Sequence, residues 1–197
     1  MAKANTRARV VDAAIVAFGG RGYDATSLDA LAGELGIRKQ TILYYFPSKE
    51  TLLDAAIDRA GGELSEVLEA SLAGAGQGWD RVEAVVRSVF RLAARQPELL
   101  GLIREVSRLG PPPTTRLTAA LDPLIQRATA FLEGEMDGGA MRRHDPRLLL
   151  LAAYSTVIGV ATEVEVLRAL GYEPTARSLV RRRAELLAFL RSALLPS

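Results

Sequence analysis

The sequence predicts an all-α protein of about nine helices, because helical periodicity dominates it. Apolar residues recur at helical spacing along most of the chain, and no segment alternates convincingly between apolar and polar residues. Clusters of glycine and proline separate the periodic stretches, as turns between helices do. With 49% hydrophobic residues among 197, the chain can bury a sizeable core. We expect a three-helix helix-turn-helix head over residues 1–48 and a helical bundle over residues 49–197.

The first helix is predicted over residues 5–19. Four apolar residues fall on one face of it: Val10, Ala14, Ala17 and Phe18. The glycine-rich run at 19–22 should end it, because glycine adopts the left-handed backbone of a helix C-terminus. Thr26 is then expected to cap the second helix, with Asp29 as its partner three residues later.

Two short helices joined by a tight turn are predicted between Thr26 and Glu50. Gly36 should end the first of them and permit the turn. The second opens with basic, amide and hydroxyl side chains and closes with aromatic ones: Arg38, Lys39, Gln40, Thr41, Tyr44, Tyr45 and Phe46. A short helix of this kind, braced by another, suits the reading of base edges in the DNA major groove.

The remaining helices are predicted from residues that can cap a helix and from glycine-rich segments that interrupt one. Ser48 can cap a helix that runs from residue 49 to about residue 72, before a glycine-rich break. Later helices are expected over five ranges: 79–95, 97–109, 115–136, 145–170 and 174–194. Pro123 should bend or interrupt the third of these. Asp145 followed by Pro146 is a strong start signal for the fourth.

The charge pattern favours phosphate binding at one end of the chain. Residues 1–50 hold seven basic and five acidic side chains, whereas the rest hold eighteen of each, so the net charge of +2 lies in the head. Lys3, Arg7 and Arg9 fall within the first ten residues. Arg7 and Arg9 could contact a groove or form a disordered tail with only nonspecific phosphate affinity.

Several classes of function are disfavoured. The absence of cysteine excludes disulfides and thiolate metal sites, and the single histidine, His144, argues against a metal site or a catalytic triad. We therefore expect no enzyme, no metal and no cofactor. The longest apolar stretch, residues 148–161, is shorter than the roughly 20 residues that a membrane helix needs. We expect a cytoplasmic protein without membrane contact.

Three pieces of sequence follow one another at fixed offsets: VVDAAIVAFGGRGYDATSLDALAGELGI, KQTILYYF and SKETLL. Together, from Val10 to Leu53, they resemble the DNA-binding domain of the TetR family of bacterial transcriptional regulators. The resemblance covers roughly the first quarter of the chain. The total length and the all-helical remainder are also similar to that family.

The resemblance implies DNA contacts from nine residues: Thr26, Ser27, Arg38, Lys39, Gln40, Thr41, Tyr44, Tyr45 and Lys49. Lys39 and Gln40 would face base edges from the start of the third helix, with Arg38 beside them. Tyr44 would lie along the groove or contact sugar and phosphate. Asp29 departs from the family, in which a basic residue is often found, and we expect it to serve the cap instead. The operator sequence therefore stays open.

The other implied contacts would position the protein on the DNA backbone. Thr41, Tyr45 and Lys49 would bind phosphates. Thr26 or Ser27 would place the start of the second helix against the backbone. Far from the head, the arginine run at 181–183 could be a second nucleic-acid patch. The alternative is the polar face that its amphipathic helix requires.

By resemblance, the helices over residues 79–170 should enclose a cavity for a small, largely apolar effector. Seven residues are candidates for its wall or its polar anchors: Phe90, Ile103, Arg104, Ser107, Phe131, Tyr154 and Ile158. Solid core is the alternative for each of them. The last two helices carry more apolar surface than a small bundle hides, and the resemblance favours a homodimer through a four-helix interface.

The expected function is that of a ligand-responsive transcriptional regulator, a repressor that binds a palindromic operator on double-stranded DNA as a dimer. Two recognition helices about 34–36 Å apart would reach successive major grooves. The effector would favour another spacing of the heads, with the helix over residues 49–72 as the lever. The alternative is the same fold acting as a protein-partner binding module without ligand control.

Overall fold

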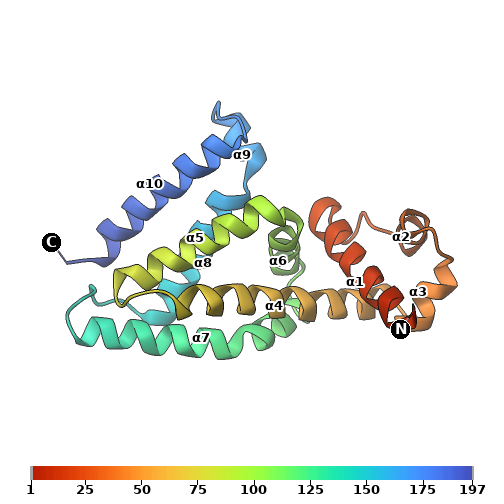
Figure 1. Cartoon of the computed structure of the whole chain (residues 1–197), viewed down its shortest axis with the longest axis horizontal. Helices are drawn as coiled ribbons and strands as arrows, with labels where there is room; N and C mark the ends of the chain where they lie inside the picture. The colour runs from red at the N-terminus through yellow and green to blue at the C-terminus, as the bar shows by residue number, and fades with distance from the viewer. Residues whose placement is uncertain (1, 197) are drawn as a thin grey trace. The chain divides into compact units, whose positions relative to one another are not determined.

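The computed structural model describes residues 2–196, with side chains from residue 5 onward, and this part of the chain forms ten α-helices (Figure 1). They are α1 (Ala2–Arg21), α2 (Leu28–Leu35), α3 (Lys39–Tyr45), α4 (Lys49–Ala73), α5 (Trp79–Arg95), α6 (Pro97–Leu109), α7 (Pro113–Asp137), α8 (Pro146–Thr162), α9 (Val164–Ala169) and α10 (Ala176–Leu194). The all-α prediction is confirmed, and the bounds of α5 and α6 match those expected from sequence.

The single helix predicted over residues 145–170 is wrong. The helical backbone breaks at Glu163, whose ψ is 69°, and this break separates α8 from α9. The carbonyl of Val160, in the last turn of α8, accepts a hydrogen bond from the guanidinium of Arg182 on α10. A partner outside the helix therefore stabilises the end of α8, which accounts for ten helices instead of nine.

The helices fall into two compact units. The first unit comprises Met1–Leu64 with Gln96–Leu121, and the second comprises Ser65–Arg95 with Asp122–Ser197. The first unit thus includes α6, which packs along α1. This unit extends beyond residue 48, because the start of α4 and all of α6 pack into its core, and the boundary of the DNA-binding domain at residue 48 stays a prediction.

The first unit has a core drawn from five helices. Its fully buried side chains include Phe18 of α1, Leu31 of α2, Ile42 of α3, Leu52 of α4 and Leu100 of α6. The helices α1 and α6 cross without side chains between them, at Gly19 and Gly101. A methyl group at position 101 would overlap the carbonyl oxygen of Gly19. Glycine at this crossing therefore permits direct backbone contact.

The cap of α2 lies one residue later than predicted. The Ser27 hydroxyl accepts a hydrogen bond from the backbone amide of Ala30 at 3.1 Å, so Ser27 is the N-cap and the prediction of Thr26 is wrong. Thr26 is instead buried, and its hydroxyl bonds the carbonyl of Gly22 at 2.9 Å. Gly36 ends α2 with a φ of 65°, as the turn prediction requires.

The second unit is built on α5, α8 and α10, which pack against one another. A second cluster joins Leu132 and Met136 of α7 to Met141 in the following loop. Within the residues described, none of the helices is both long and apolar enough to cross a membrane.

Candidate nucleic-acid interface

The helix α3 presents two kinds of face. Ile42 is buried in the core of the first unit, and Phe46, which ends the helix, is buried beside it. Gln40 and Tyr44, four residues apart, are exposed on the outer face, and Tyr44 is 69% exposed. Arg38 precedes the helix with an extended backbone, and its exposed guanidinium makes no hydrogen bond that caps the start of the helix.

Eight of the nine predicted DNA-binding residues have a side chain at the surface of the first unit. We define these as the recognition surface: Ser27, Arg38, Lys39, Gln40, Thr41, Tyr44, Tyr45 and Lys49. Thr26 is the exception, because it is only 3% exposed and its hydroxyl bonds main-chain carbonyls. Ser27 is therefore the member of that pair whose side chain is exposed.

The aromatic end of α3 is ordered by ring contacts. Tyr44 and Tyr45 meet edge to face, with ring centroids 5.1 Å apart. The guanidinium of Arg7 lies 5.0 Å from the ring centre of Phe46. Arg7 and Arg9 belong to α1, so the tail interpretation is wrong for both of them. The side chain of Lys3 lies outside the described residues.

Lys49 is held at the start of α4 by Tyr23. Its ammonium lies 4.1 Å from the centre of the Tyr23 ring, whose hydroxyl donates to Glu50 at 3.3 Å. Burial, followed by the charge of Glu50, raises the pKa of Tyr23 to about 12, so its hydroxyl stays protonated at neutral pH. An ammonium on an aromatic face keeps its N–H donors available, which suits a phosphate contact.

Lys39 has a partner that sequence reasoning missed. Its ammonium donates to the carboxylate of Asp29 on α2 at 2.8 Å. Asp29 was expected to serve the cap of α2, but that role is excluded because the cap is Ser27 and its bonded amide belongs to Ala30. The pair joins α2 to the first residue of α3.

A second missed group connects α6 to the loop between α1 and α2. Glu105 accepts the backbone N–H of Tyr23 at 2.7 Å and also accepts from Arg108 at 2.8 Å. Arg108 reaches Asp24 at 3.2 Å. The hydrogen bond from Arg108 is the largest cause that lowers the pKa of Glu105. These residues lie more than 80 positions apart in sequence, and no local pattern joins them.

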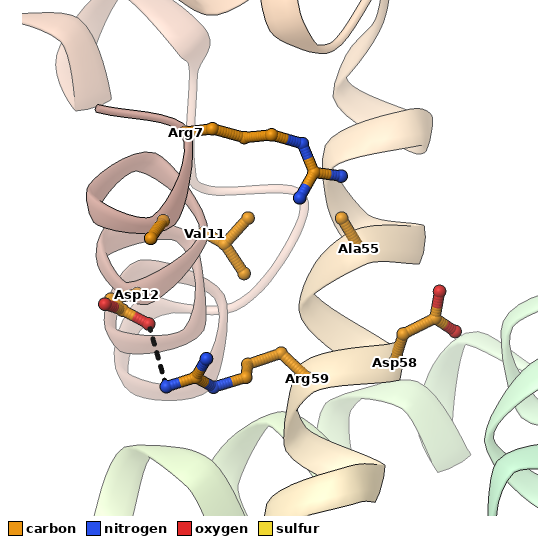
Figure 2. Close-up of a pocket in the computed structure, with 7 residues that line it drawn as sticks. Arg7, Val11, Asp12, Ala55, Asp58 and Arg59 are labelled. Carbon is orange, nitrogen blue, oxygen red and sulfur yellow. Dashed lines mark ion pairs between the residues drawn. The ribbon is translucent and has the colours of Figure 1, made fainter. Parts of the chain in front are cut away.

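A shallow pocket of about 360 Å³ lies between α1 and α4 of the first unit (Figure 2). Its lining is Arg7, Ala8, Val11, Asp12, Ala55, Asp58 and Arg59. The guanidinium of Arg59 is 4.0 Å from Asp12, and Arg116 holds Asp58 through two hydrogen bonds of 2.7 and 2.6 Å. The lining is charged and includes none of the residues predicted to bind an effector.

The predicted effector residues are divided between the two units. Ile103, Arg104 and Ser107 belong to α6 in the first unit, where Ile103 is buried and Ser107 donates its hydroxyl to the carbonyl of Ile103 at 3.1 Å. The other four belong to the second unit: Phe90, Phe131, Tyr154 and Ile158. Phe90 and Ile158 are buried and Tyr154 is exposed. The cavity therefore stays a prediction.

Two of the three arginines in the run of α10 make contacts within the second unit. Arg181 lies over the ring of Tyr172, with 5.7 Å between guanidinium and ring centre. Arg182 bonds the carbonyl of Val160, and burial lowers the pKa of its guanidinium. These contacts favour the structural interpretation of the run over a nucleic-acid patch. Among the described residues, no three acidic or histidine side chains could hold a metal ion together.

Comparison with known proteins agrees with this arrangement. Residues 10–56 match the family described as bacterial regulatory proteins, tetR family. The biofilm operon icaADBC negative transcriptional regulator IcaR of Staphylococcus aureus is 35% identical over 49 residues, which are 25% of this chain and 26% of that protein. The transcriptional regulator BetI of Rhizobium meliloti is 34% identical over 92 residues, 47% of this chain and 45% of BetI. The chain thus matches these curated relatives over less than half of their length.

The whole fold is shared with a solved structure. A transcriptional regulator from Saccharomonospora viridis, in complex with choline, superimposes with a TM-score of 0.79 over 98% of this chain and 100% of that one, at 21% identity. The helix-turn-helix of α2 and α3 lies inside the segment matched by the family. The comparisons thus indicate the tetR family of bacterial regulatory proteins through residues 10–56, and the similarity over the rest of the chain is one of fold.

Proposed function

We propose that this chain is a transcriptional regulator that binds a palindromic operator on double-stranded DNA as a homodimer. It acts as a repressor and leaves the DNA when a small molecule binds. The observation that carries the proposal is the recognition surface, in which polar and basic side chains crowd the outer face of α3 while Ile42 anchors the helix to the core. The description of IcaR as a negative regulator supports the repressor role. Such a protein acts in the cytoplasm, where bacterial DNA lies.

The recognition surface offers two types of DNA contact. Arg38 and Gln40 have long exposed side chains that suit base edges, with arginine directed to guanine and glutamine to adenine. Thr41, Tyr45 and Lys49 offer hydroxyl and ammonium groups that suit phosphates. The first group would set the operator sequence, and the second would set the position of α3 in the groove.

The second unit supports dimerisation. Leu148 and Leu151 of α8 and Val180 and Phe189 of α10 are each more than half exposed. Monomeric soluble proteins rarely leave large apolar patches uncovered. A second copy of the chain would cover this face symmetrically, with α8 and α10 from each subunit forming a four-helix interface.

The effector is proposed to be small and largely apolar. It acts only if it binds the released form more tightly than the DNA-bound form, since a ligand shifts an equilibrium by its difference in affinity. The seven candidate residues are divided between the two units, so the residues of each unit need to be substituted separately to find those that contact the effector. The choline of the Saccharomonospora viridis complex belongs to that protein and sets no ligand for this chain.

The test selects binding sequences from random duplexes and then measures affinity at two salt concentrations. Lys49→Ala should weaken binding to every sequence and reduce the salt slope by about one. Gln40→Ala should change the preferred sequence at one position, with a loss of discrimination of about 1–3 kcal/mol. Arg143→Ala, which removes an exposed charge from the second unit, is the control and should change neither quantity.

One outcome of these binding experiments would favour the alternative function. A chain that binds no duplex even at low salt, but binds a protein from the same cell, would act as a protein-partner module on this fold. If Lys49→Ala leaves affinity and salt slope unchanged while the wild type binds DNA, the phosphate role of Lys49 is wrong.

A further inference from the structure

The ion pair between Lys39 and Asp29 joins a residue of the recognition surface to an acid of α2. Lys39 is the first residue of α3, and Asp29 is in the first turn of α2. The ammonium and the carboxylate are 2.8 Å apart, and their side chains are 40% and 70% exposed. Both residues belong to the first unit, in which α2 packs on α3. The pair is thus accessible to any DNA that meets α3.

We propose that Asp29 is a specificity-determining residue: it withholds the charge of Lys39 from phosphates and directs the remaining N–H groups of that ammonium to a base edge. The inference rests on the proposed function, because it concerns how the recognition surface separates operator from other DNA.

The electrostatic part of the argument concerns nonspecific DNA. Affinity for arbitrary sequences arises from phosphates neutralised by lysine and arginine, with a salt slope of about −0.9 per phosphate. Lysine carries a compact charge on a flexible stem and could reach a phosphate wherever one lies. Paired with Asp29, Lys39 contributes no net charge. The carboxylate of Asp29 also repels the phosphates of operator and other DNA alike, so this repulsion lowers both affinities and leaves their ratio unchanged.

The geometric part concerns the operator. An ammonium has three N–H donors, and Asp29 takes one of them. The other two can be donated to the O6 and N7 acceptors of a guanine. This contact requires no separation of the ion pair, because the base edge carries no formal charge. The tether also restricts the lysine stem before DNA arrives, so less side-chain freedom is lost on binding.

Another acid on α2 provides a matched control. Glu34, at the opposite end of the helix, pairs with Arg21 at 2.8 Å. Neither Glu34 nor Arg21 belongs to the recognition surface. The variants Asp29→Asn and Glu34→Gln therefore remove the same charge from the same helix, but only the first releases Lys39.

The experiment measures the affinity of the full chain for its selected operator and for an unrelated duplex. Asp29→Asn should raise nonspecific affinity about fivefold at 0.15 M salt and steepen its salt slope by about 0.9, the effect of one phosphate contact. Operator affinity should rise less, so the ratio between the two falls. Glu34→Gln should leave that ratio unchanged. Circular dichroism spectra of both variants check that the helices are retained.

A second pair of variants tests whether Asp29 acts through Lys39. In a Lys39→Gln background, Asp29→Asn should no longer alter the ratio of operator to nonspecific affinity. The proposal is overturned if Asp29→Asn and Glu34→Gln change that ratio equally, or if the effect of Asp29→Asn persists without Lys39. A wild-type chain that binds no duplex overturns the proposed function and this inference with it. If only the role of Asp29 is wrong, the wild type still binds its operator more tightly than the unrelated duplex. The two failures can therefore be distinguished.

Discussion

Among the described side chains, two large hydrophobic residues are exposed in the first unit, whereas eight are exposed in the second. Those of the first unit are Val16 and Tyr44. Those of the second are Leu148, Leu151, Tyr154, Val166, Leu170, Tyr172, Val180 and Phe189. The first unit therefore has few large apolar side chains on its surface, which suits contact with a nucleic acid. The second offers apolar side chains, which suit another protein surface.

The largest effect expected in the first unit comes from Gly101→Ala. The new methyl group would overlap the backbone of Gly19, which cannot yield by a side-chain rotation. We expect the free energy of unfolding to fall by about 3 kcal/mol. Denaturant unfolding would measure it. Gly62→Ala, at an exposed position of α4 with no atom near the added methyl, should instead be neutral or stabilising by up to about 1 kcal/mol. Equal effects would show that the α1–α6 contact is not tight.

The next largest effect distinguishes the exposed apolar face of the second unit from the surface of the first unit. Phe189→Glu places a charge in the exposed apolar face of α10 and should raise the dimer dissociation constant at least about 30-fold, as expected when a central apolar contact is lost. Analytical ultracentrifugation would follow the oligomeric state. Val16→Glu makes the same change at the exposed apolar residue of α1 and should leave the dimer intact. A monomeric wild type, or equal loss in both variants, would contradict the contrast between the units.

A moderate effect is expected from Glu105→Ala. The change leaves the Tyr23 amide and Arg108 without their carboxylate, which should cost about 1–2 kcal/mol of unfolding free energy and loosen the loop before α2. Glu133→Ala, an exposed acid of α7, is the control. Unfolding measured by fluorescence would compare the variants. An unchanged stability for Glu105→Ala would show that the loop is held without α6.

The lowered pKa of Glu105 determines how the stability difference between the wild type and Glu105→Ala changes with pH. The pKa of Glu105 is lowered in the folded chain, so its stabilisation is present above the ordinary value of 4.5 and is lost as pH falls through the folded value. The difference between the wild type and Glu105→Ala should therefore persist from neutral pH to about pH 5 and shrink below it. A stability difference that grows as the pH falls below about 5 would contradict this prediction.

The smallest effect is expected from Tyr23→Phe. The hydroxyl bonds the exposed Glu50 at 3.3 Å, so its removal should change stability at neutral pH by less than about 0.5 kcal/mol. The pKa of Tyr23 is raised to about 12, so the wild type should lose stability as pH rises from about 10 to about 12, and the variant should lose less. An ultraviolet titration of the phenolate would check the pKa itself.

Local signals in the sequence predicted where several helices begin and end. Gly36 adopts the left-handed backbone that was expected of it, and Asp145 caps α8 ahead of Pro146 as its start signal indicated. Each of these features depends on a few neighbouring residues. The same reasoning misplaced the cap of α2, because Thr26 and Ser27 are both good caps and only burial separates them.

Contacts between distant segments could not be predicted in the same way. The bond of Glu105 to the Tyr23 amide joins positions 82 residues apart. The break at Glu163 lies within the segment 145–170 that was predicted as one helix, and the carbonyl of Val160 in the last turn before it is bonded by Arg182 of another helix. Even the pairing of Lys39 with Asp29 requires the angle between α2 and α3. Such contacts depend on tertiary packing, which helical periodicity does not encode.

The glycines at the crossing of α1 and α6 also constrain how this protein can diverge. Because two main chains touch there, neither codon can change alone to encode a larger residue without forcing the helix axes apart. A descendant with side chains at this point would need both positions altered, together with a wider spacing that its core would have to refill. The pair should therefore be inherited or lost as one, and a homologue that keeps only one glycine should show a measurably larger distance between these two helices.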